Sequence, residues 1–436
     1  MDRNGGGTLK SDKKHTCSGG TIKAHTGLKI QPSHGLSFSG CKGASGVTVG
    51  NFQEVGPIDD SLKPRNSSWL RKADLFFVDN PVGTGYSYVE DKSLFVKTDW
   101  ENAADLTTLL KHVFNTNANL QKSPLYIVAE SYGGKFAVTL GLSALQAIEK
   151  GTLKLQLGGI ALGDSWMSPE DYVFSWGPLL YDVSRLDENG LERSNRLSQE
   201  IKKKIDAAEF KNATTLWGQL QGVIGENSDG VDLYNFLSDL NSDDDALLGS
   251  TVSNKAYLQN KVPKKRYSNY LRSLKEKNMM KPSSAAGHPL DLPTLMGGPI
   301  RNKLRIIPKN LTWGEQEDAV FERMMGDFMR PRIEEVDELL AKGVNVTIYN
   351  GQLDVICSTK GTESWIRKLK WKGLKAFLRK ERTPLYCGGK GSTKAFTKSY
   401  SNLNFYWILG AGHFVPADQP CVTLDMVQRI TQSPAA

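Results

Sequence analysis

Position 131 is a serine in a setting that favours a nucleophile. The apolar run 125–128 reads as a buried strand that ends shortly before Ser131, and a helix-compatible stretch begins soon after it. A strand, a sharp turn and a helix expose a serine hydroxyl above the edge of a parallel sheet. The residues two positions before and after the serine must be small in such a turn, and they are Ala129 and Gly133. The pattern predicts covalent catalysis by the Ser131 hydroxyl.

A candidate acid and a candidate base follow this serine along the chain. Asp354 lies just beyond a β-branched strand predicted at 344–349, at the strand end where parallel sheets place active-site groups. His413 follows a second predicted strand, 403–409, and a short glycine-containing turn. A histidine can take the proton of a serine hydroxyl, and a carboxylate can orient that histidine and stabilise its cation. Because serine, acid and histidine occur in the chain order of the α/β-hydrolase fold, we expect that fold.

The five other histidines fit the role of the base less well. Three of them fall in the first 42 residues, His112 lies in a predicted helix, and His288 lies in a loop flanked by glycine and proline. His413 alone combines a strand-to-loop position with a preceding acid that itself follows the serine. The alternative for His413 is a solvated loop histidine without a catalytic role.

Several longer segments resemble the serine carboxypeptidases of peptidase family S10, over about residues 43 to 434. Beside the turn around Ser131, the matching segments are 50–57, 77–88, 163–166, 350–354 and 411–416. The resemblance implies that Ser131 is the nucleophile, Asp354 the triad carboxylate and His413 the base. It implies an enzyme that releases C-terminal amino acids from peptides through an acyl-enzyme, without a metal or another cofactor.

The resemblance also implies how a free peptide C-terminus would be bound. Glu130 would share a proton with Glu54 and donate a hydrogen bond to the terminal carboxylate of the substrate, which requires a raised pKa for Glu130. A preference for mildly acidic pH would follow. Cys357 and Phe414, each close to a triad residue, are expected to line the side-chain pockets that flank the scissile bond. The alternatives are ordinary surface carboxylates for the two glutamates and ordinary core packing for Cys357 and Phe414.

The residues before position 43 depart from the family pattern. Where the family has a glycine-rich turn, Cys41 stands for the second glycine, Lys42 for the proline, and Ser39 for an amide side chain. By resemblance, the backbone N–H groups of Cys41 and Tyr132 would form the oxyanion hole. A backbone donor is compatible with a cysteine, but a Cβ is unfavourable where φ is positive. The loss of one such donor lowers the rate by about 10²–10³.

The first 42 residues have the composition of a disordered segment. They carry seven basic side chains against two acidic ones, together with glycine tracts and no long apolar run. Such a composition buries too little surface to offset the entropy of ordering, so we expect disorder and the loss of the first strands of the fold. A signal peptide needs a continuous apolar core of about 7–15 residues, and we find none here. The resemblance nevertheless implies a secreted, vacuolar or lysosomal protein.

Two alternatives to a carboxypeptidase stay open. Plant relatives use the same triad to transfer an acyl group from a sugar ester to an alcohol, so acyl transfer is one alternative. The other is a catalytically inactive form with an altered N-terminus. The products separate the first alternative from peptidase activity, because one reaction releases a free amino acid and the other forms an ester.

The domain organisation follows from where strands and helices alternate. Apolar residues at helical spacing predict a crossover helix at 100–114, and the alternation around it predicts a mostly parallel sheet with helices on both faces. We assign 43–168 and 331–436 to the hydrolase core and 169–330 to a mainly helical cap insertion. The helices predicted within the cap are 191–210, 215–224 and 231–239.

The charge balance does not point to nucleic acid. The chain has a net charge of +8 and a pI of about 9.0, but the first 42 residues hold much of this excess, and charges elsewhere are mixed in sign. No stretch approaches the roughly 18 apolar residues of a membrane span. We therefore expect peptides with a free C-terminal carboxylate as partners, and neither nucleic acid nor a membrane. The oligomeric state is left open.

Cysteines and glycosylation signals bear on the compartment. With two of the five cysteines in the first 42 residues, at most one disulfide is expected among Cys357, Cys387 and Cys421, and the sequence does not say which. Sequons that would mark surface loops of a secreted protein begin at Asn66, Asn212, Asn310 and Asn345. Asn345 falls in a predicted core strand and is the least suited to carry a glycan.

Overall fold

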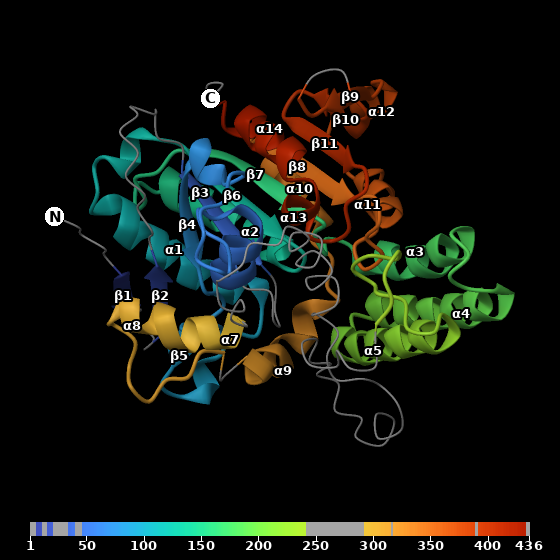
Figure 1. Ribbon diagram of the computed structural model, residues 1–436, viewed down its shortest axis with the longest axis horizontal. Coiled ribbons are helices and arrows are strands. Elements are labelled where there is room, and N and C mark those ends of the chain that lie inside the picture. The colour runs from blue at the N-terminus through green and yellow to red at the C-terminus, as the bar shows by residue number, and fades with distance from the viewer. Residues whose placement is uncertain are drawn as a thin grey trace, which may run out of the picture.

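A mixed sheet forms the centre of the molecule (Figure 1). The computed structural model describes residues 6–10, 15–20, 34–39, 46–240, 292–314, 317–388 and 391–432, so Cys41 and His288 lie outside the described residues. Within this part of the chain the sheet has 11 strands in the order β1-β2-β4-β3-β6-β7-β8-β11-β10-β9, with β5 beside β2. The strands are β1 (Gly6–Lys10), β2 (His15–Gly20), β3 (His34–Ser39), β4 (Asp74–Val78), β5 (Tyr88–Val89), β6 (Leu125–Glu130), β7 (Leu157–Gly163), β8 (Val346–Gly351), β9 (Thr383–Tyr386), β10 (Thr393–Tyr400) and β11 (Leu403–Ile408).

The middle of the sheet is parallel, as the sequence predicted. The six consecutive strands β4, β3, β6, β7, β8 and β11 pair in parallel with one another, whereas the pairs further out on both sides are antiparallel. In β8 and β11, Val346 lies opposite Leu403 and Gly351 opposite Ile408. The segments after β6, β7, β8 and β11 therefore leave the sheet at the same edge, where open α/β sheets carry their active sites.

The first 42 residues differ from the sequence-based expectation. We expected disorder and missing first strands, but the described segments β1, β2 and β3 all belong to this sheet. Strand β3 lies between β4 and β6, with its Leu36 opposite Phe76 and Ile127. A strand in that place pairs the N–H and C=O groups of both neighbours, which would otherwise present open edges. Composition averaged over 42 residues does not reveal a strand of 6 residues.

Helices cover both faces of the sheet, as the alternation predicted. Alternate residues of β6 face opposite ways: Ile127 packs in a cluster with residues of α1 and α2, and Val128 packs in a second cluster with residues of α14. The helices of this core are α1 (Asp99–Asn115), α2 (Gly133–Glu149), α10 (Ile333–Ala341), α11 (Thr359–Ile366), α12 (Leu374–Arg379), α13 (Val415–Asp418) and α14 (Pro420–Thr431). Among the described helices, none combines the length and the apolar character that crossing a membrane requires.

The chain between β7 and α10 is mainly helical where the structure describes it. Its described helices are α3 (Pro169–Asp182), α4 (Glu188–Asp206), α5 (Phe210–Asn227), α7 (Leu292–Leu295), α8 (Arg301–Leu304) and α9 (Glu317–Phe328). Helices α3, α4 and α5 pack side by side at one end of the molecule, beyond the end of the sheet (Figure 1).

The helix predicted at 231–239 is not formed. This segment turns back on itself, with a bridge between Val231 and Asp239. The side chain of Asp232 accepts a hydrogen bond from the backbone N–H of Tyr234 at 2.9 Å, and Asn235 accepts one from Leu237 at 3.1 Å. Such local side-chain acceptors compete with helical carbonyls, and this is why aspartate and asparagine favour turns over helix interiors.

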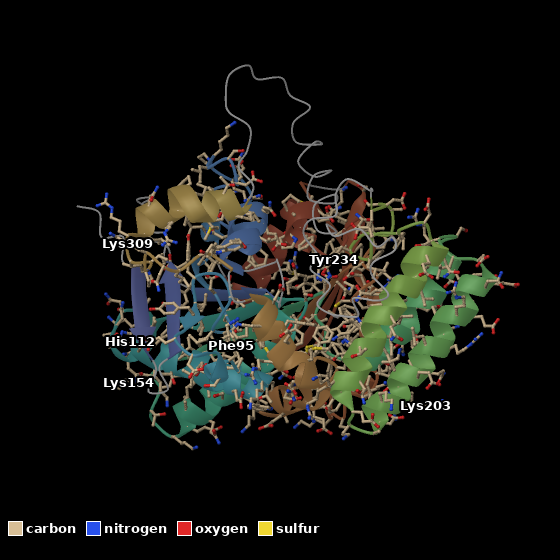
Figure 2. All side chains as sticks on the ribbon, turned by 90° about the horizontal axis from the view of Figure 1, so that it is seen from below. Phe95, His112, Lys154, Lys203, Tyr234 and Lys309 are labelled. Carbon is tan, nitrogen blue, oxygen red and sulfur yellow. A yellow bond between two sulfur atoms is a disulfide. The ribbon has the colours of Figure 1, made fainter. Side chains whose placement is uncertain are left out.

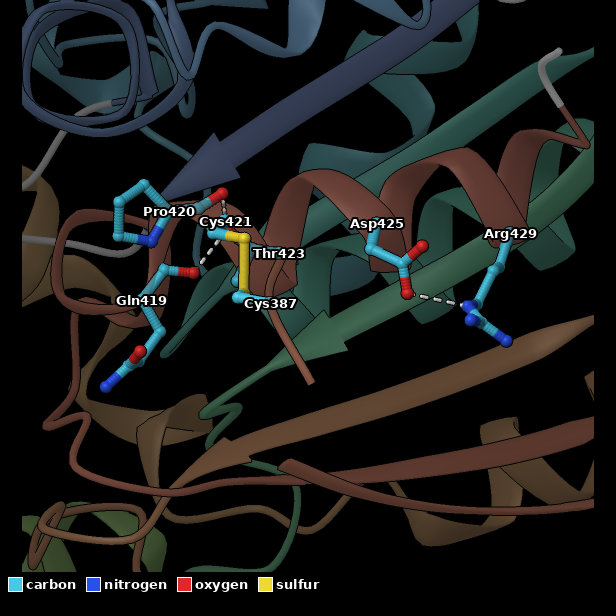
Figure 3. Close-up of a disulfide and its surroundings, with 7 residues drawn as sticks. All are labelled: Cys387, Gln419, Pro420, Cys421, Thr423, Asp425 and Arg429. Atoms are coloured by element: carbon cyan, nitrogen blue, oxygen red, sulfur yellow. Dashed lines mark hydrogen bonds and ion pairs between the residues drawn. A yellow bond between two sulfur atoms is a disulfide. The ribbon is translucent and has the colours of Figure 1, made fainter. Parts of the chain in front are cut away.

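One disulfide ties the end of the sheet to the last helix. Cys387, just after β9, is bonded to Cys421 at the start of α14 (Figure 3). Cys357 is a buried free thiol. The sequence allowed one pair among these three cysteines and left the choice open. The asparagines of all four sequons are exposed. Asn345 lies one residue before β8. The prediction that it falls inside a core strand was wrong, because the strand begins at Val346.

Candidate active site

Ser131 occupies a strained turn between β6 and α2. Its φ is 57°, in the left-handed region that residues with a Cβ rarely adopt. Its N–H donates to the carbonyl of Gly163 at 3.0 Å, and its own carbonyl accepts from Trp166 N–H at 2.9 Å. A Cβ on Gly134 would come within 2.4 Å of the Ser165 side chain, so this glycine lets the turn approach the next strand. The turn directs the half-buried Ser131 away from the sheet at the N-terminus of α2, where the helix dipole favours negative charge.

His413 and Asp354 form a buried pair at the same sheet edge. His413 Nδ1 lies 2.9 Å from Asp354 Oδ2, and both side chains are buried. A hydrogen on Nδ1 leaves Nε2 as the acceptor of a serine proton. The backbone N–H of His413 donates to the carbonyl of Tyr234 at 2.8 Å, and the Tyr234 ring meets the imidazole edge to face at 4.7 Å. The pair is thus held from both the sheet and the turned segment that replaces the predicted helix.

Two glycines allow these loops to meet. A Cβ on Gly351 would lie 2.0 Å from the carbonyl oxygen of Gly412, and a Cβ on Gly412 would lie 2.4 Å from the carbonyl oxygen of Tyr234. Backbone oxygens cannot move aside as a flexible side chain could. Glycine at both positions is therefore needed to bring the His413 loop against the end of β8.

The structure joins two of the three predicted triad residues directly. None of the described residues forms a hydrogen bond with the Ser131 hydroxyl, so the contact from Ser131 to His413 is not made. Catalytic hydrogen bonds of this kind often tighten only when substrate is bound. The exposed His112 on α1 lies toward the edge of the view in Figure 2, whereas the half-buried Tyr234, the neighbour of His413, lies nearer its centre.

Glu54 and Glu130 share a buried site. Their carboxyl groups interact with each other, and neither Glu54 Oε1 nor Glu130 Oε2 accepts a hydrogen bond from a donor of the described residues. Burial raises the pKa of Glu54 from 4.5 to about 7. Burial, and then the charge of Glu54, raises the pKa of Glu130 well above its usual range. Ionising both of two neighbouring carboxyl groups is strongly unfavourable, so the pair keeps at least one proton near pH 7.

A third carboxyl group lies in the same region. Burial raises the pKa of Asp418 from 3.8 to about 7, although the N–H of Gly412 donates to it at 2.7 Å. The charge of Asp418 also raises the pKa of both glutamates. Asp418 is absent from the residues that the sequence singled out, and only its place five residues after His413 could have suggested it.

Cys357 and Phe414 lie next to the triad residues but inside the protein. The reactive atoms of Cys357, Asp354 and His413 all lie within 4.8 Å of one another. Burial, and then the charge of Asp354, raises the pKa of the Cys357 thiol well above its usual range. The Phe414 ring stacks on Tyr234 with 5.7 Å between centroids. Both side chains are almost fully buried, so pocket lining by them remains a prediction.

A buried charge cluster holds the residue after the nucleophile. The Tyr132 hydroxyl donates to Asp99 Oδ1 at 2.7 Å. Arg332 contacts Asp99 Oδ2 at 2.7 Å and Asp327 Oδ2 at 2.6 Å, and Lys135 lies 3.4 Å from Asp99. No sequence pattern indicated this cluster, because its members come from α1, α2, the end of α9 and the residue before α10.

These features define the class of enzyme. A serine in a left-handed turn after a parallel strand, with a buried Asp–His pair from strands further along the same sheet, is the arrangement of an α/β-hydrolase. A sequence model of the serine carboxypeptidases matches residues 36–433, and the chain belongs to this family of hydrolases. The match begins inside β3, seven residues earlier than the resemblance drawn from the sequence.

Relatives and a solved structure agree with this assignment. The chain is 57% identical over 401 residues to "Serine carboxypeptidase-like 51" of Arabidopsis thaliana, covering 92% of this chain and 85% of the relative. It is 44% identical over 398 residues to the human "Retinoid-inducible serine carboxypeptidase", covering 91% and 83%. The crystal structure of Kex1, a prohormone-processing carboxypeptidase from Saccharomyces cerevisiae, has the same fold, with a TM-score of 0.74, 19% identity, and 98% and 90% coverage.

Proposed function

We propose that this protein is a serine carboxypeptidase that removes the C-terminal amino acid from peptides through an acyl-enzyme. The buried Asp354–His413 pair at 2.9 Å, at the sheet edge that carries Ser131, is the observation on which this proposal rests. His413 Nε2 takes the proton of Ser131, and Ser131 Oγ attacks the carbonyl carbon of the last peptide bond. His413 then gives this proton to the leaving amine. The amino acid departs, and water hydrolyses the acyl-enzyme with His413 again as base.

The oxyanion of each tetrahedral intermediate would be bound by backbone N–H groups. The Tyr132 N–H lies at the start of α2, where the helix dipole adds to its effect. The Cys41 N–H is our candidate for the second donor, because β3 leads toward this position alongside β6. A backbone donor needs no particular side chain, so the cysteine is compatible with the role.

The Glu54–Glu130 pair would recognise the free C-terminus. A protonated carboxyl group can donate a hydrogen bond to the substrate carboxylate, whereas an ionised one would repel it. Glu130 directly precedes the nucleophile, so this contact would place the last peptide bond beside Ser131. We propose that Cys357 and Phe414 line the adjoining pockets and that the 169–330 insertion, as a cap on the 43–168 and 331–436 core, shapes them.

The products of a defined peptide test the proposal. We expect an N-blocked dipeptide to yield one free amino acid, and the Ser131→Ala variant to yield none. Ser399→Ala, which removes an exposed serine hydroxyl on β10, serves as the matched control and should keep the wild-type rate. Formation of an ester from an activated acyl donor and an alcohol, without release of an amino acid from the dipeptide, would favour acyl transfer instead.

We further propose that the protein matures in an oxidising, secretory-type compartment. The Cys387–Cys421 disulfide and the four exposed sequon asparagines are typical of secreted, vacuolar or lysosomal proteins. Expression in a secretory host should give a protein whose mass falls on treatment with an N-glycosidase. An unchanged mass, with all four asparagines unmodified, would refute the glycoprotein assignment.

A further inference from the structure

Asp164 is a buried carboxyl group beside the triad that the proposed mechanism does not use. It is the first residue after β7, which lies between β6 and β8 in the sheet (Figure 1). Its side chain is fully buried, and its φ of 38° lies in the left-handed region. A buried acid in a conformation that residues with a Cβ rarely adopt is often kept for a functional reason.

The contacts of Asp164 show which of its oxygens is engaged. Oδ1 accepts two hydrogen bonds, one from the N–H of Gly351 at 2.8 Å and one from Asn350 Nδ2 at 2.9 Å. Oδ2 receives no hydrogen bond from an N–H or O–H group of the described residues. The remaining partner of this carboxyl group is the carboxyl group of Asp354. Asp164 is therefore anchored to the end of β8 through Oδ1, and its Oδ2 is a buried atom without a donor from the described residues.

The proton of this carboxyl pair belongs on Asp164. Two ionised carboxylates are both acceptors, so they can form a hydrogen bond only if one of them is protonated. Asp354 already accepts from His413 Nδ1 at 2.9 Å on Oδ2 and from the Cys357 N–H at 3.3 Å on Oδ1. Burial, and then the negative charge of Asp354, raises the pKa of Asp164 well above its usual range.

We infer that Asp164 is a positioning residue of the active site: it keeps a proton on Oδ2 and donates it in a hydrogen bond to Asp354. The array then runs from Asp164 through Asp354 and His413 toward Ser131. The hydrogen bond fixes the orientation of the Asp354 carboxylate and so of the imidazole. This inference rests on the proposed function, because it assigns Asp354 the task of orienting a catalytic base.

Negative charges dominate the electrostatics of Asp164. Apart from burial, the charges that act on it most are those of Asp354 and Glu130, and both raise its pKa. The hydrogen bond from the Gly351 N–H lowers this pKa and is outweighed. Around Asp354 lie His413, at 2.9 Å, and the Cys357 thiol, and the charge of Asp354 also raises the pKa of Tyr172 and Tyr234. Burial and the two negative charges therefore favour the neutral form of Asp164.

Comparison of two substitutions tests the inference by activity. In Asp164→Asn the amide oxygen can still accept from Gly351 and Asn350, and the amide N–H can donate to Asp354, so this conservative variant reproduces the protonated acid. In Asp164→Ala the donor is lost, and kcat should fall by about tenfold to a hundredfold, as for loss of a hydrogen bond to a charged group, with little change in KM. We expect Asp164→Asn to recover most of this loss and to keep the acidic limb of the kcat/KM profile at its wild-type pH. A shift of that limb by about one pH unit in Asp164→Asn would mean that a negative charge had been removed, and would overturn the inference.

An infrared measurement tests the protonation state without any activity. The wild-type minus Asp164→Asn difference spectrum at pH 7 should contain the carbonyl band of a protonated carboxylic acid. A difference spectrum that contains carboxylate bands instead would overturn the inference, even in a fully active enzyme. Conversely, a protonated band together with an absence of amino acid release would leave the carboxyl pair in place and refute the proposed function, so the two failures are distinguishable.

Discussion

Raising the pH through about 7 should weaken the binding of peptides that have a free C-terminal carboxylate. Burial raises the pKa of Glu54 to about 7 and that of Glu130 well above 4.5, so both carboxyl groups are protonated at mildly acidic pH. Because these folded-state pKa values lie above those of the free side chains, the pair is fully protonated below pH 4.5, and its first proton is lost from Glu54 as the pH rises through about 7. Loss of that proton adds a negative charge beside the substrate carboxylate, and the proton left on Glu130 is then held by the ionised Glu54 instead of being offered to the substrate.

The size of the effect depends on the position of this pKa. At pH 8.5, which is about 1.5 units above the pKa of the pair, the protonated fraction has fallen about 30-fold, or about 2 kcal/mol at 1.36 kcal/mol per unit. We expect kcat/KM for an N-blocked dipeptide to fall by the same factor from its plateau. The matching dipeptide amide lacks the carboxylate and should lose much less.

Glu54→Gln provides the decisive variant for this prediction. Its amide cannot ionise, and burial keeps the pKa of Glu130 above its usual range, so kcat/KM for the free-acid dipeptide should start from a lower plateau and stay flat from pH 7 to pH 8.5. Asp418→Asn is the control, because the pKa of Asp418 is also raised to about 7 and its carboxyl group accepts from Gly412. Because the charge of Asp418 raises the pKa of both glutamates, this control should keep the fall and shift it to lower pH. The same 30-fold loss in Glu54→Gln, or a loss of activity on the amide substrate in parallel with the acid, would refute the prediction.

Three further predictions concern the framework of the site. Arg332→Leu leaves the buried carboxylates of Asp99 and Asp327 without their main partner and should lower the free energy of unfolding by about 3–5 kcal/mol in a urea titration. The control Arg193→Leu breaks an exposed ion pair and should lower it by under about 1 kcal/mol. Equal losses in the two variants would contradict the account. Gly412→Ala should lower kcat about tenfold or more, because its Cβ would lie 2.4 Å from the carbonyl oxygen of Tyr234 and a shift of about 1 Å in the His413 loop can have that effect. A wild-type kcat in this variant would contradict the prediction. Reduction of the disulfide Cys387–Cys421, whose cysteines are 34 residues apart, should lower stability by about 2–4 kcal/mol in the same titration, and an unchanged midpoint would contradict it.

The sequence predicted where the proposed triad residues lie in the fold, because local pattern determines these positions. Ser131, Asp354 and His413 each come after a strand with a clear apolar run, and parallel strands bring the residues at their carboxyl ends to one sheet edge. The order of the three residues then restricts the fold to very few alternatives. Helix α1 was predicted from the helical spacing of its apolar residues.

The parts that the sequence did not predict depend on contacts between distant segments. Strand β3 lies in a segment of unfavourable composition and is ordered by pairing with β4 and β6. The turned segment around Tyr234 has helical spacing in the sequence, but the side chains of Asp232 and Asn235 supply local acceptors that favour a turn over a helix. Three further features require knowledge of which buried groups meet: the proton inferred on Asp164, the pairing of Cys387 with Cys421, and the charge cluster that holds Tyr132.

Labelling of the purified protein by a fluorophosphonate probe at mildly acidic pH tests most directly whether Ser131 is an activated nucleophile. We predict covalent labelling of wild type and of Ser399→Ala, no labelling of Ser131→Ala, and strongly reduced labelling of His413→Ala. A folded wild-type protein that stays unlabelled, or a Ser131→Ala variant that is labelled as well as wild type, would contradict the central claim.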